Sequence, residues 1–148
     1  MLVAEDDPHD KFLLQRAIQK SGLPITARFF EDGEEAVNYL KGEGQYGDRA
    51  KYPLPRLLLL DIKMPRKNGF EVLEEVRAMP ALKRIIAVMF SSSDLERDID
   101  RAYDLGANAY VVKPQGNDQL VMVLRRLHDF WFMTNRPSPG LGSELHAG

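Results

Sequence analysis

Short apolar runs alternate along the chain with segments of helical periodicity. Each run is bounded by proline, glycine or charged residues and is too short for a buried helix, which predicts a strand buried on both faces. The predicted strands are Leu2–Ala4, Ile25–Phe30, Leu57–Leu60, Ile85–Phe90 and Ala109–Val112. Because helical segments separate them, the pattern predicts an α/β fold: a doubly wound five-stranded parallel sheet with helices on both faces.

The predicted helices carry local start and stop signals. The first follows Asp7-Pro8, an N-cap followed by proline, and ends near Gly22. The second helix begins after Asp32, and the third carries Phe70, Leu73 and Val76. The fourth runs from about Asp94 to Leu105. The fifth carries Leu120, Val123, Leu124, Leu127 and Trp131 at helical spacing. Residues 42–56 form a polar loop longer than most connections. This loop fits either a partner-contacting surface or an insertion, and we favour an insertion.

Two of the predicted strands end in carboxylates. Four leucines lead into Asp61, and Leu2–Ala4 leads into Glu5 and Asp6. Ligands of parallel sheets bind beyond the carboxyl ends of the strands, so these acids are presented to a site. If the strands are neighbours, Asp6 and Asp61 would repel by about 3 kcal/mol at roughly 5 Å and an effective dielectric of 20. Either one acid keeps a proton or a divalent cation binds between them, and an all-oxygen site with few carboxylates favours Mg²⁺.

Two further strands end in a hydroxyl and an ammonium group. The fourth strand stops at Ser91, and the fifth stops at Lys113-Pro114. Taken singly, a serine run is usually a helix cap and a Lys-Pro pair is usually a solvated turn. A buried lysine, however, needs negative charge nearby. Convergence of four strand ends on carboxylates, hydroxyl and ammonium therefore favours a functional site.

Composition sets limits on the class of protein. The 148 residues suit one domain, and the contents of 44% hydrophobic and 28% charged residues are ordinary for globular proteins. A net charge of -2 argues against a nucleic-acid partner, which would need a basic surface. Since cysteine is absent, disulfides and thiolate metal sites are excluded, and we expect a cytoplasmic location. No apolar stretch approaches ~20 residues, so we expect no membrane-spanning helix and no membrane partner.

The chain resembles the receiver domain of two-component response regulators over nearly its full length. The resemblance is carried, in order and spacing, by Glu5-Asp6, Asp61, Met64-Pro65, Asn68-Gly69, Ser91, the run 102–110 and Lys113-Pro114. It is closest to the stand-alone receivers found beside phytochrome-type and other multi-sensor histidine kinases, which share a long loop before the third strand and an aromatic tail. The resemblance implies a flavodoxin-like fold and a sensor histidine kinase as partner.

The resemblance also implies a role for each site residue. Asp61 would accept a phosphoryl group from a phosphohistidine, forming an acyl phosphate. Asp6 would bind Mg²⁺ directly and Glu5 through water, and Asp61 and the backbone carbonyl of Lys63 would complete the protein ligands. Lys113 would pair with the phosphoryl oxygens.

A conformational switch is implied as well. The hydroxyl of Ser91 would donate to the phosphoryl group once it has arrived, and Tyr110 would then rotate inward and remodel the face formed by the fourth helix, fifth strand and fifth helix. Pro114 would follow a cis peptide bond. Serine at position 91 stands where threonine is more frequent in the family, which keeps the hydroxyl and frees its rotamer.

Two alternative functions belong to other classes. A Mg²⁺-dependent phosphohydrolase with an aspartyl nucleophile shares this set of groups, but it would normally need a second acid two residues after the nucleophile, where Lys63 stands. An interaction module that works without phosphorylation would show substitutions at Asp61, Asp6 or Lys113, and all three are present. We therefore favour a phosphoacceptor protein.

The end of the chain predicts an association surface. We assign residues 1–133 to the receiver domain and 134–148 to a flexible tail rich in glycine and proline, with no output domain. One stripe of the last helix packs on the core, and Phe130, Phe132 and Met133 have no predicted place in that core. Apolar side chains gathered at a terminus favour a homodimer, formed by the fifth helix and the tail through Leu127, Phe130, Trp131 and Phe132. The alternative is that these aromatics fold back onto their own domain.

Overall fold

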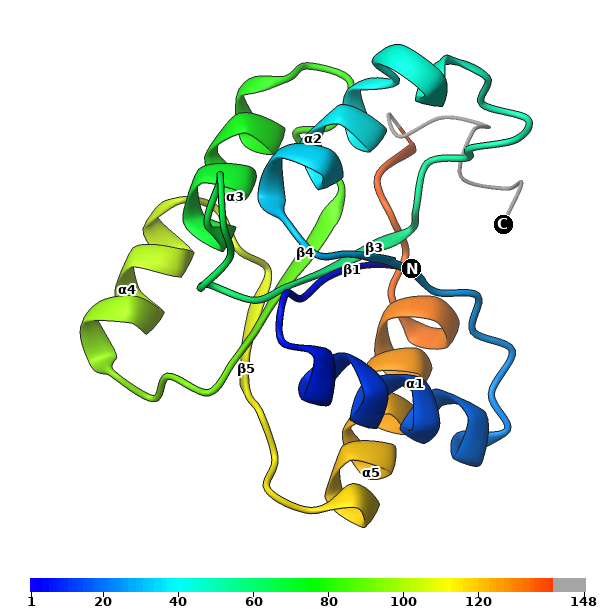
Figure 1. The fold of residues 1–148 in the computed structure, drawn as a ribbon, viewed down its shortest axis with the longest axis vertical. Helices are drawn as coiled ribbons and strands as arrows, with labels where there is room; N and C mark the ends of the chain where they lie inside the picture. The colour runs from blue at the N-terminus through cyan, green and yellow to red at the C-terminus, as the bar shows by residue number, and fades with distance from the viewer. Residues whose placement is uncertain (140–148) are drawn as a thin grey trace.

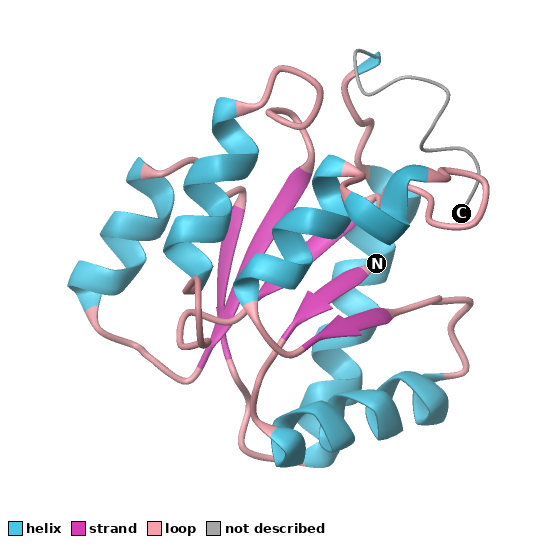
Figure 2. Ribbon diagram, turned by 45° about the horizontal axis from the view of Figure 1, so that its top comes forward, coloured by secondary structure: helices cyan, strands magenta, loops and turns pink. Residues whose placement is uncertain are grey.

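The structure is a computed structural model and describes residues 1–139. These residues form a layer of parallel strands between two layers of helices (Figures 1 and 2). The strands are β1 (Leu2–Ala4), β2 (Arg28–Phe30), β3 (Leu57–Leu60), β4 (Ile86–Ser91) and β5 (Ala109–Val112). The helices are α1 (Pro8–Ser21), α2 (Gly33–Lys41), α3 (Gly69–Ala78), α4 (Glu96–Asp104) and α5 (Asn117–Leu127). The strand order β2-β1-β3-β4-β5 confirms the predicted doubly wound, flavodoxin-like sheet.

The leucine run of β3 explains how one sheet serves two cores. Leu58 and Leu60 pack among side chains of α2 and α3, whereas Leu57 and Leu59 pack among side chains of α1 and α5. Successive residues of a strand point to opposite faces, so both faces must be apolar when both are covered. All four leucines are accordingly buried.

Strand β2 is shorter than the sequence predicts. It begins at Arg28 rather than at Ile25, because its only neighbour in the sheet is the three-residue strand β1. Leu2 pairs with Arg28 and Ala4 pairs with Phe30. Before this point the chain turns, and the amide of Ile25 donates to the carbonyl of Leu23 at 2.8 Å.

The caps of α1 agree with the sequence signals. The side chain of Asp7 accepts hydrogen bonds from the amides of His9 and Asp10 at the start of α1, and Gly22 ends that helix in the left-handed conformation. Asn68 and Glu71 form a capping box at the start of α3. These caps fix where the first turn of each helix lies relative to the sheet.

Helix α4 is the least buried of the helices that flank the sheet. Ala102 is its only buried residue, while Leu95 before it and Tyr103 within it are about half exposed (47% and 50%). Its N-cap, Leu95, makes no side-chain capping bond. The guanidinium of Arg101 lies 4.5 Å from the ring centroid of Phe70 on α3. The helix therefore rests on the sheet with little apolar surface.

The long connection after α2 is folded against the domain. It contains a short 3₁₀ helix, η1 (Gly44–Gly47), and the Arg49 guanidinium donates to the backbone carbonyls of Tyr39, Leu40 and Tyr52 at 2.7–3.2 Å. Tyr39 also donates to the carbonyl of Pro53 at 2.6 Å and packs its ring against those of Phe30, Tyr46 and Tyr52. Arg49 and this aromatic cluster thus brace the connection, which was predicted only as a polar loop.

The end of α5 continues into a π-helical segment, η2 (His128–Thr134), that partly folds back onto the domain. Leu127 is buried (9% exposed), so it is not available to a partner, contrary to the sequence prediction. Phe132 also packs against the core and lies under the Arg56 guanidinium at 5.0 Å, and Trp131 is half-buried. Phe130 and Met133 remain exposed, at 50% and 72%. Most of the predicted tail, residues 140–148, lies outside the described residues.

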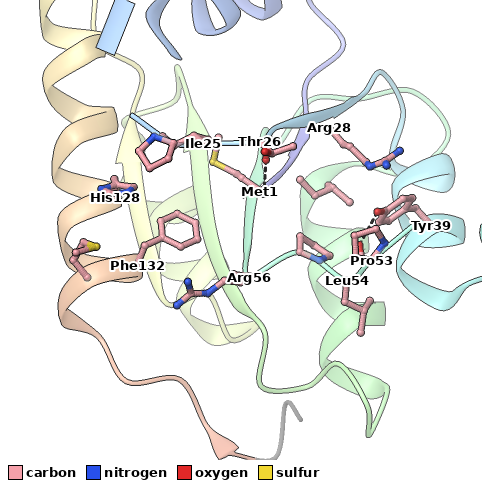
Figure 3. A pocket seen from close by; sticks show the side chains of 14 residues that line it. Met1, Ile25, Thr26, Arg28, Tyr39, Pro53, Leu54, Arg56, His128 and Phe132 are labelled. Carbon is pink, nitrogen blue, oxygen red and sulfur yellow. Dashed lines mark hydrogen bonds between the residues drawn. The ribbon is translucent and has the colours of Figure 1, made fainter. Parts of the chain in front are cut away.

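A cavity of about 310 Å³ lies at the amino ends of β1, β2 and β3 (Figure 3). Its walls include Ile25, Leu54 and Phe132, with Arg28 and Arg56 among its lining residues. The carboxylates that end the strands lie at the opposite edge of the sheet, so this cavity is separate from them.

Among the helices of residues 1–139, none combines the length and the apolar character that crossing a bilayer requires.

We predict that Arg49→Ala lowers the free energy of unfolding by about 2–3 kcal/mol, because three backbone carbonyls lose a charged donor. Urea denaturation measures this change. The matched control is Lys51→Ala, since Lys51 is exposed and only approaches the ring of Tyr52, at 5.3 Å. We expect a change within about 0.5 kcal/mol for the control. Equal effects of the two substitutions would contradict the bracing role of Arg49.

Candidate functional site

The acidic residues that follow β1 and β3 meet at one edge of the sheet. Ala4 pairs with Leu60, so the residues after them are neighbours, and the amide of Asp61 donates to the carbonyl of Ala4 at 3.0 Å. One carboxylate oxygen from each of Glu5, Asp6 and Asp61 lies within 4.8 Å of the others. The predicted proximity of Asp6 and Asp61 is therefore present, and we call these three residues the acidic group.

The ammonium group of Lys113 lies within reach of this acidic group. Its Nζ donates to Glu5 Oε2 at 2.6 Å and to Asp61 Oδ2 at 2.9 Å. Burial by itself lowers the pKa of Lys113, but hydrogen bonds to Asp10, Glu5 and Asp61 outweigh burial, so the pKa of Lys113 lies above its usual value. Lys113 is therefore a permanent cation at neutral pH.

Asp10 also binds Lys113, and the sequence interpretation missed it. Its Oδ2 accepts from Lys113 Nζ at 2.8 Å. Asp10 stands in the first turn of α1, where acidic residues are common because they stabilise the helix dipole. The available signal was its position three residues after the N-cap Asp7, on the turn that faces the carboxyl ends of the strands.

Burial, more than the repulsion between carboxylates, changes the acidity of Glu5. Burial raises the pKa of the Glu5 carboxyl to about 7; the hydrogen bond from Lys113 opposes this change, and the charge of Asp61 adds to it. Glu5 is only 2% exposed. The structure thus combines a carboxyl that readily holds a proton with a lysine that supplies positive charge.

The phosphoacceptor candidate Asp61 is held by the backbone around it. It is 9% exposed, and its Oδ1 accepts from the amide of Ile62 at 2.7 Å. Gly69, at the start of α3, passes so close to the Asp61 backbone that a Cβ at position 69 would lie 2.0 Å from the Asp61 carbonyl oxygen. Glycine at this position therefore lets α3 start directly beside Asp61.

Ser91 ends β4 and connects the site to the following loop. Ser91 is buried (4% exposed), and its Oγ accepts from the amide of Ser93 at 3.1 Å. Ser93 Oγ donates to Asp98 of α4 at 2.6 Å, and the Ser93 carbonyl accepts from the Tyr110 hydroxyl at 2.8 Å. A chain of hydrogen bonds therefore runs from the end of β4 to α4 and β5.

The predicted cis bond before Pro114 is wrong for this structure, since no peptide bond among residues 1–139 is cis. The amide of Lys113 donates to the carbonyl of Ser91 at 2.8 Å, which continues the pairing of β4 and β5 by one residue. Extended backbone is also the favoured conformation for a residue before proline, and the trans bond is the lower in energy. Lys113 reaches all three carboxylates with this trans bond.

The acidic group fits a divalent cation of the Mg²⁺ or Mn²⁺ type. Such hard cations take carboxylate and carbonyl oxygens as ligands, and the close approach of three carboxylates leaves negative charge that one ammonium does not cancel. The Lys63 carbonyl stays a predicted ligand. The arrangement can support attack by a carboxylate on a phosphoryl group, because the Lys113 ammonium beside Asp61 can offset the negative charge of the phosphoryl oxygens.

Comparisons with known proteins identify the family of this chain. The family model described as response regulator receiver domain matches residues 1–125. The chain is 33% identical over 134 residues to response regulator Rcp1 of Synechocystis, covering 90% of this chain and 89% of that protein. It is also 33% identical to a probable methanogenesis regulatory protein, FilR2 of Methanothrix harundinacea, covering 95% of this chain and 87% of that protein.

Solved structures give the same result. The phosphorylated cyanobacterial phytochrome response regulator RcpA has a TM-score of 0.83 and 38% identity, covering 92% of this chain and 95% of its own. RPA3017, a response regulator in red light signalling of R. palustris, has a TM-score of 0.87 and 34% identity, covering 93% and 96%. The Mn²⁺-bound form of Rcp1 has a TM-score of 0.80 and 32% identity, covering 93% and 96%. The chain therefore belongs to the family of response regulator receiver domains.

Proposed function

We propose that this protein accepts a phosphoryl group on Asp61 from a sensor histidine kinase and signals through the resulting conformational change. The observation that carries the proposal is the position of Asp61 at the carboxyl edge of the sheet, 2.9 Å from the Lys113 ammonium and within the acidic group. Membership of the receiver family supports phosphorylation-based signalling. The phosphorylated relative RcpA supports it further.

In the proposed reaction, a carboxylate oxygen of Asp61 attacks the phosphorus of a phosphohistidine. A P–O bond forms, the P–N bond breaks, and the histidine nitrogen leaves with its electron pair. The Lys113 ammonium already lies beside Asp61 Oδ2, so it is placed to bind a phosphoryl oxygen as it arrives. Ser91 Oγ accepts a hydrogen bond from Ser93, which leaves its own hydrogen free to donate to the phosphoryl group.

The acidic group would hold a divalent cation, for which we propose Mg²⁺. Glu5, Asp6 and Asp61 supply carboxylate oxygens, and the Lys63 carbonyl would complete the set. When bound, Mg²⁺ neutralises negative charge on the phosphoryl oxygens. The Mn²⁺-bound form of the relative Rcp1 supports a divalent metal.

The proposed switch uses the hydrogen-bond chain of Ser91, Ser93 and Tyr110. If Ser91 moves toward a phosphoryl group, its bond to the Ser93 amide pulls the loop before α4. Tyr110 and Asp98 are both bonded to Ser93, so β5 and α4 are coupled to the same movement. The output is then a change in the face formed by α4, β5 and α5.

The partner we propose is a sensor histidine kinase of the phytochrome type, acting in the cytoplasm. This choice rests on similarity to RcpA, a phytochrome response regulator, and to RPA3017 of red light signalling. The phosphohydrolase alternative is not favoured, because Lys63 stands where that chemistry needs a second acid.

We also propose a homodimer through the segment after α5. Phe130 and Met133 remain exposed on η2, whereas Trp131 and Phe132 are partly covered by the domain. Burying each exposed side chain is worth about 1.5–3 kcal/mol. In a symmetric dimer, Phe130 and Met133 of each copy would be buried against the other copy.

The first prediction from the proposed function is that acetyl phosphate with Mg²⁺ adds one phosphoryl group to the protein, and that Asp61→Asn abolishes the addition. Asparagine keeps the shape of the side chain and removes the nucleophilic oxygen. Intact-mass spectrometry measures the product, and Asp94→Asn, an exposed acid after β4, is the control. Phosphate on Asp61→Asn would rule out Asp61. Release of phosphate over many rapid turnovers would instead favour a phosphohydrolase.

The second prediction concerns coupling. Tyr110→Phe removes the hydroxyl that binds the Ser93 carbonyl, so we expect a loss of about 1 kcal/mol in stability and a smaller response of α4 to phosphorylation. Hydrogen exchange of the α4 amides before and after phosphorylation measures the response. Tyr103→Phe, on the exposed side of α4, serves as the control. An unchanged response in Tyr110→Phe would contradict the switch.

The third prediction is that Phe130→Glu and Met133→Glu each weaken self-association at least tenfold, because a carboxylate cannot be buried in an apolar interface. Sedimentation velocity over a range of concentrations measures this. Phe12→Glu is the control, since Phe12 is comparably exposed (57%) but lies on α1. A monomeric unmodified chain, or equal weakening by Phe12→Glu, would exclude the proposed interface.

A further inference from the structure

The ammonium of Lys113 is shared among three carboxylates that do not have the same role. An ammonium group has three N–H donors, and here they reach Glu5, Asp10 and Asp61 at 2.6, 2.8 and 2.9 Å. Glu5 and Asp61 belong to the acidic group that would hold a cation. Of these three acceptors, only Asp10 lies outside it.

Asp10 differs from the other two in position and burial. It comes from the first turn of α1 rather than from a strand end, and its side chain is 38% exposed, compared with 3% for Glu5 and 11% for Asp61. The Asp7 cap, which accepts from the Asp10 amide at 3.0 Å, fixes this turn. Lys113 is only 11% exposed, so its charge cannot depend on water for compensation.

A cation bound by Glu5, Asp6 and Asp61 must compete with Lys113 for two of these carboxylates. Positive charges close together repel, so cation binding favours movement of the ammonium away from Glu5 and Asp61. Asp10, which lies outside the acidic group, is the acceptor that stays available. The ammonium can then remain buried and paired while its contacts with Glu5 and Asp61 weaken.

We propose that Asp10 is a positioning residue: it anchors Lys113 while a divalent cation occupies the acidic group. The proposal rests on the cation site proposed above. It adds that Asp10 acts through Lys113 rather than as a ligand. It follows that removing the Asp10 charge forces Lys113 back onto Glu5 and Asp61, where it competes with the cation.

The test is a double-mutant cycle on Mg²⁺ affinity, measured by isothermal titration calorimetry on the full chain. We expect Asp10→Asn to weaken Mg²⁺ binding about fivefold or more. In a Lys113→Met background, where no ammonium competes, the same substitution is expected to change the affinity by less than about twofold. Asp10→Glu, which keeps the charge, should restore part of the loss.

Asp7→Asn is the matched control. It removes a charge three residues away, keeps a good N-cap and does not contact Lys113, so we expect a change below about twofold. Circular dichroism confirms folding of each variant. Equal loss on Asp10→Asn in both backgrounds, or no loss in either, would overturn the anchoring role. Failure of the unmodified chain to bind Mg²⁺ would contradict the cation site itself, which separates the two proposals.

Discussion

The balance of charge around Lys113 is the constraint on which the rest of the site depends. Sheet topology brings the acids after β1 and β3 to one place, where they would repel one another. The lysine from the end of β5 offsets that repulsion, and the first turn of α1 contributes Asp10 as a further acceptor. Removing one partner from such a buried set leaves an unpaired charge, which is why the four segments must keep their relative positions.

The fold supplies this geometry because chain order and spatial order differ. β1 lies between β2 and β3, and β5 lies at the far edge, two strands from Asp61. A short residue at the end of β5 would not reach β1, whereas the lysine side chain spans the distance to both Glu5 and Asp61. The apolar strands hold the ends in register, and both faces of the sheet must be covered for them to do so.

The sequence predicted those features that are encoded by strand ends. Asp61, Glu5, Asp6, Ser91 and Lys113 each follow an apolar run, so their meeting at one edge follows from the parallel sheet alone. Asp10 could not be found this way, because a helical acid near an N-cap has a local explanation that needs no site.

Other differences arose from tertiary packing. Leu127 and Phe132 carry no local signal that separates a side chain folded back on its own domain from one left for a partner. The length of β2 depends on its short neighbour β1. The connection after α2 was interpreted as an insertion, since the contacts that brace it, from Arg49 and from the aromatic cluster around Tyr39, form only in the folded domain.

The sparse burial of α4 has a consequence for the form of the signal. With Ala102 as its only buried side chain, the helix loses little apolar surface when it moves, so competing positions differ by little free energy. Shifting the population ratio of two positions from 1:99 to 99:1 needs about 5.5 kcal/mol. One charge-assisted hydrogen bond supplies about 1.5–3 kcal/mol. Lys113 is already paired with Asp61 in this structure, so the new bond that reaches the loop before α4 is the one from Ser91. One such bond would therefore redistribute α4 between positions instead of locking it. The expected output is graded, and a binding partner that prefers one position would complete the shift.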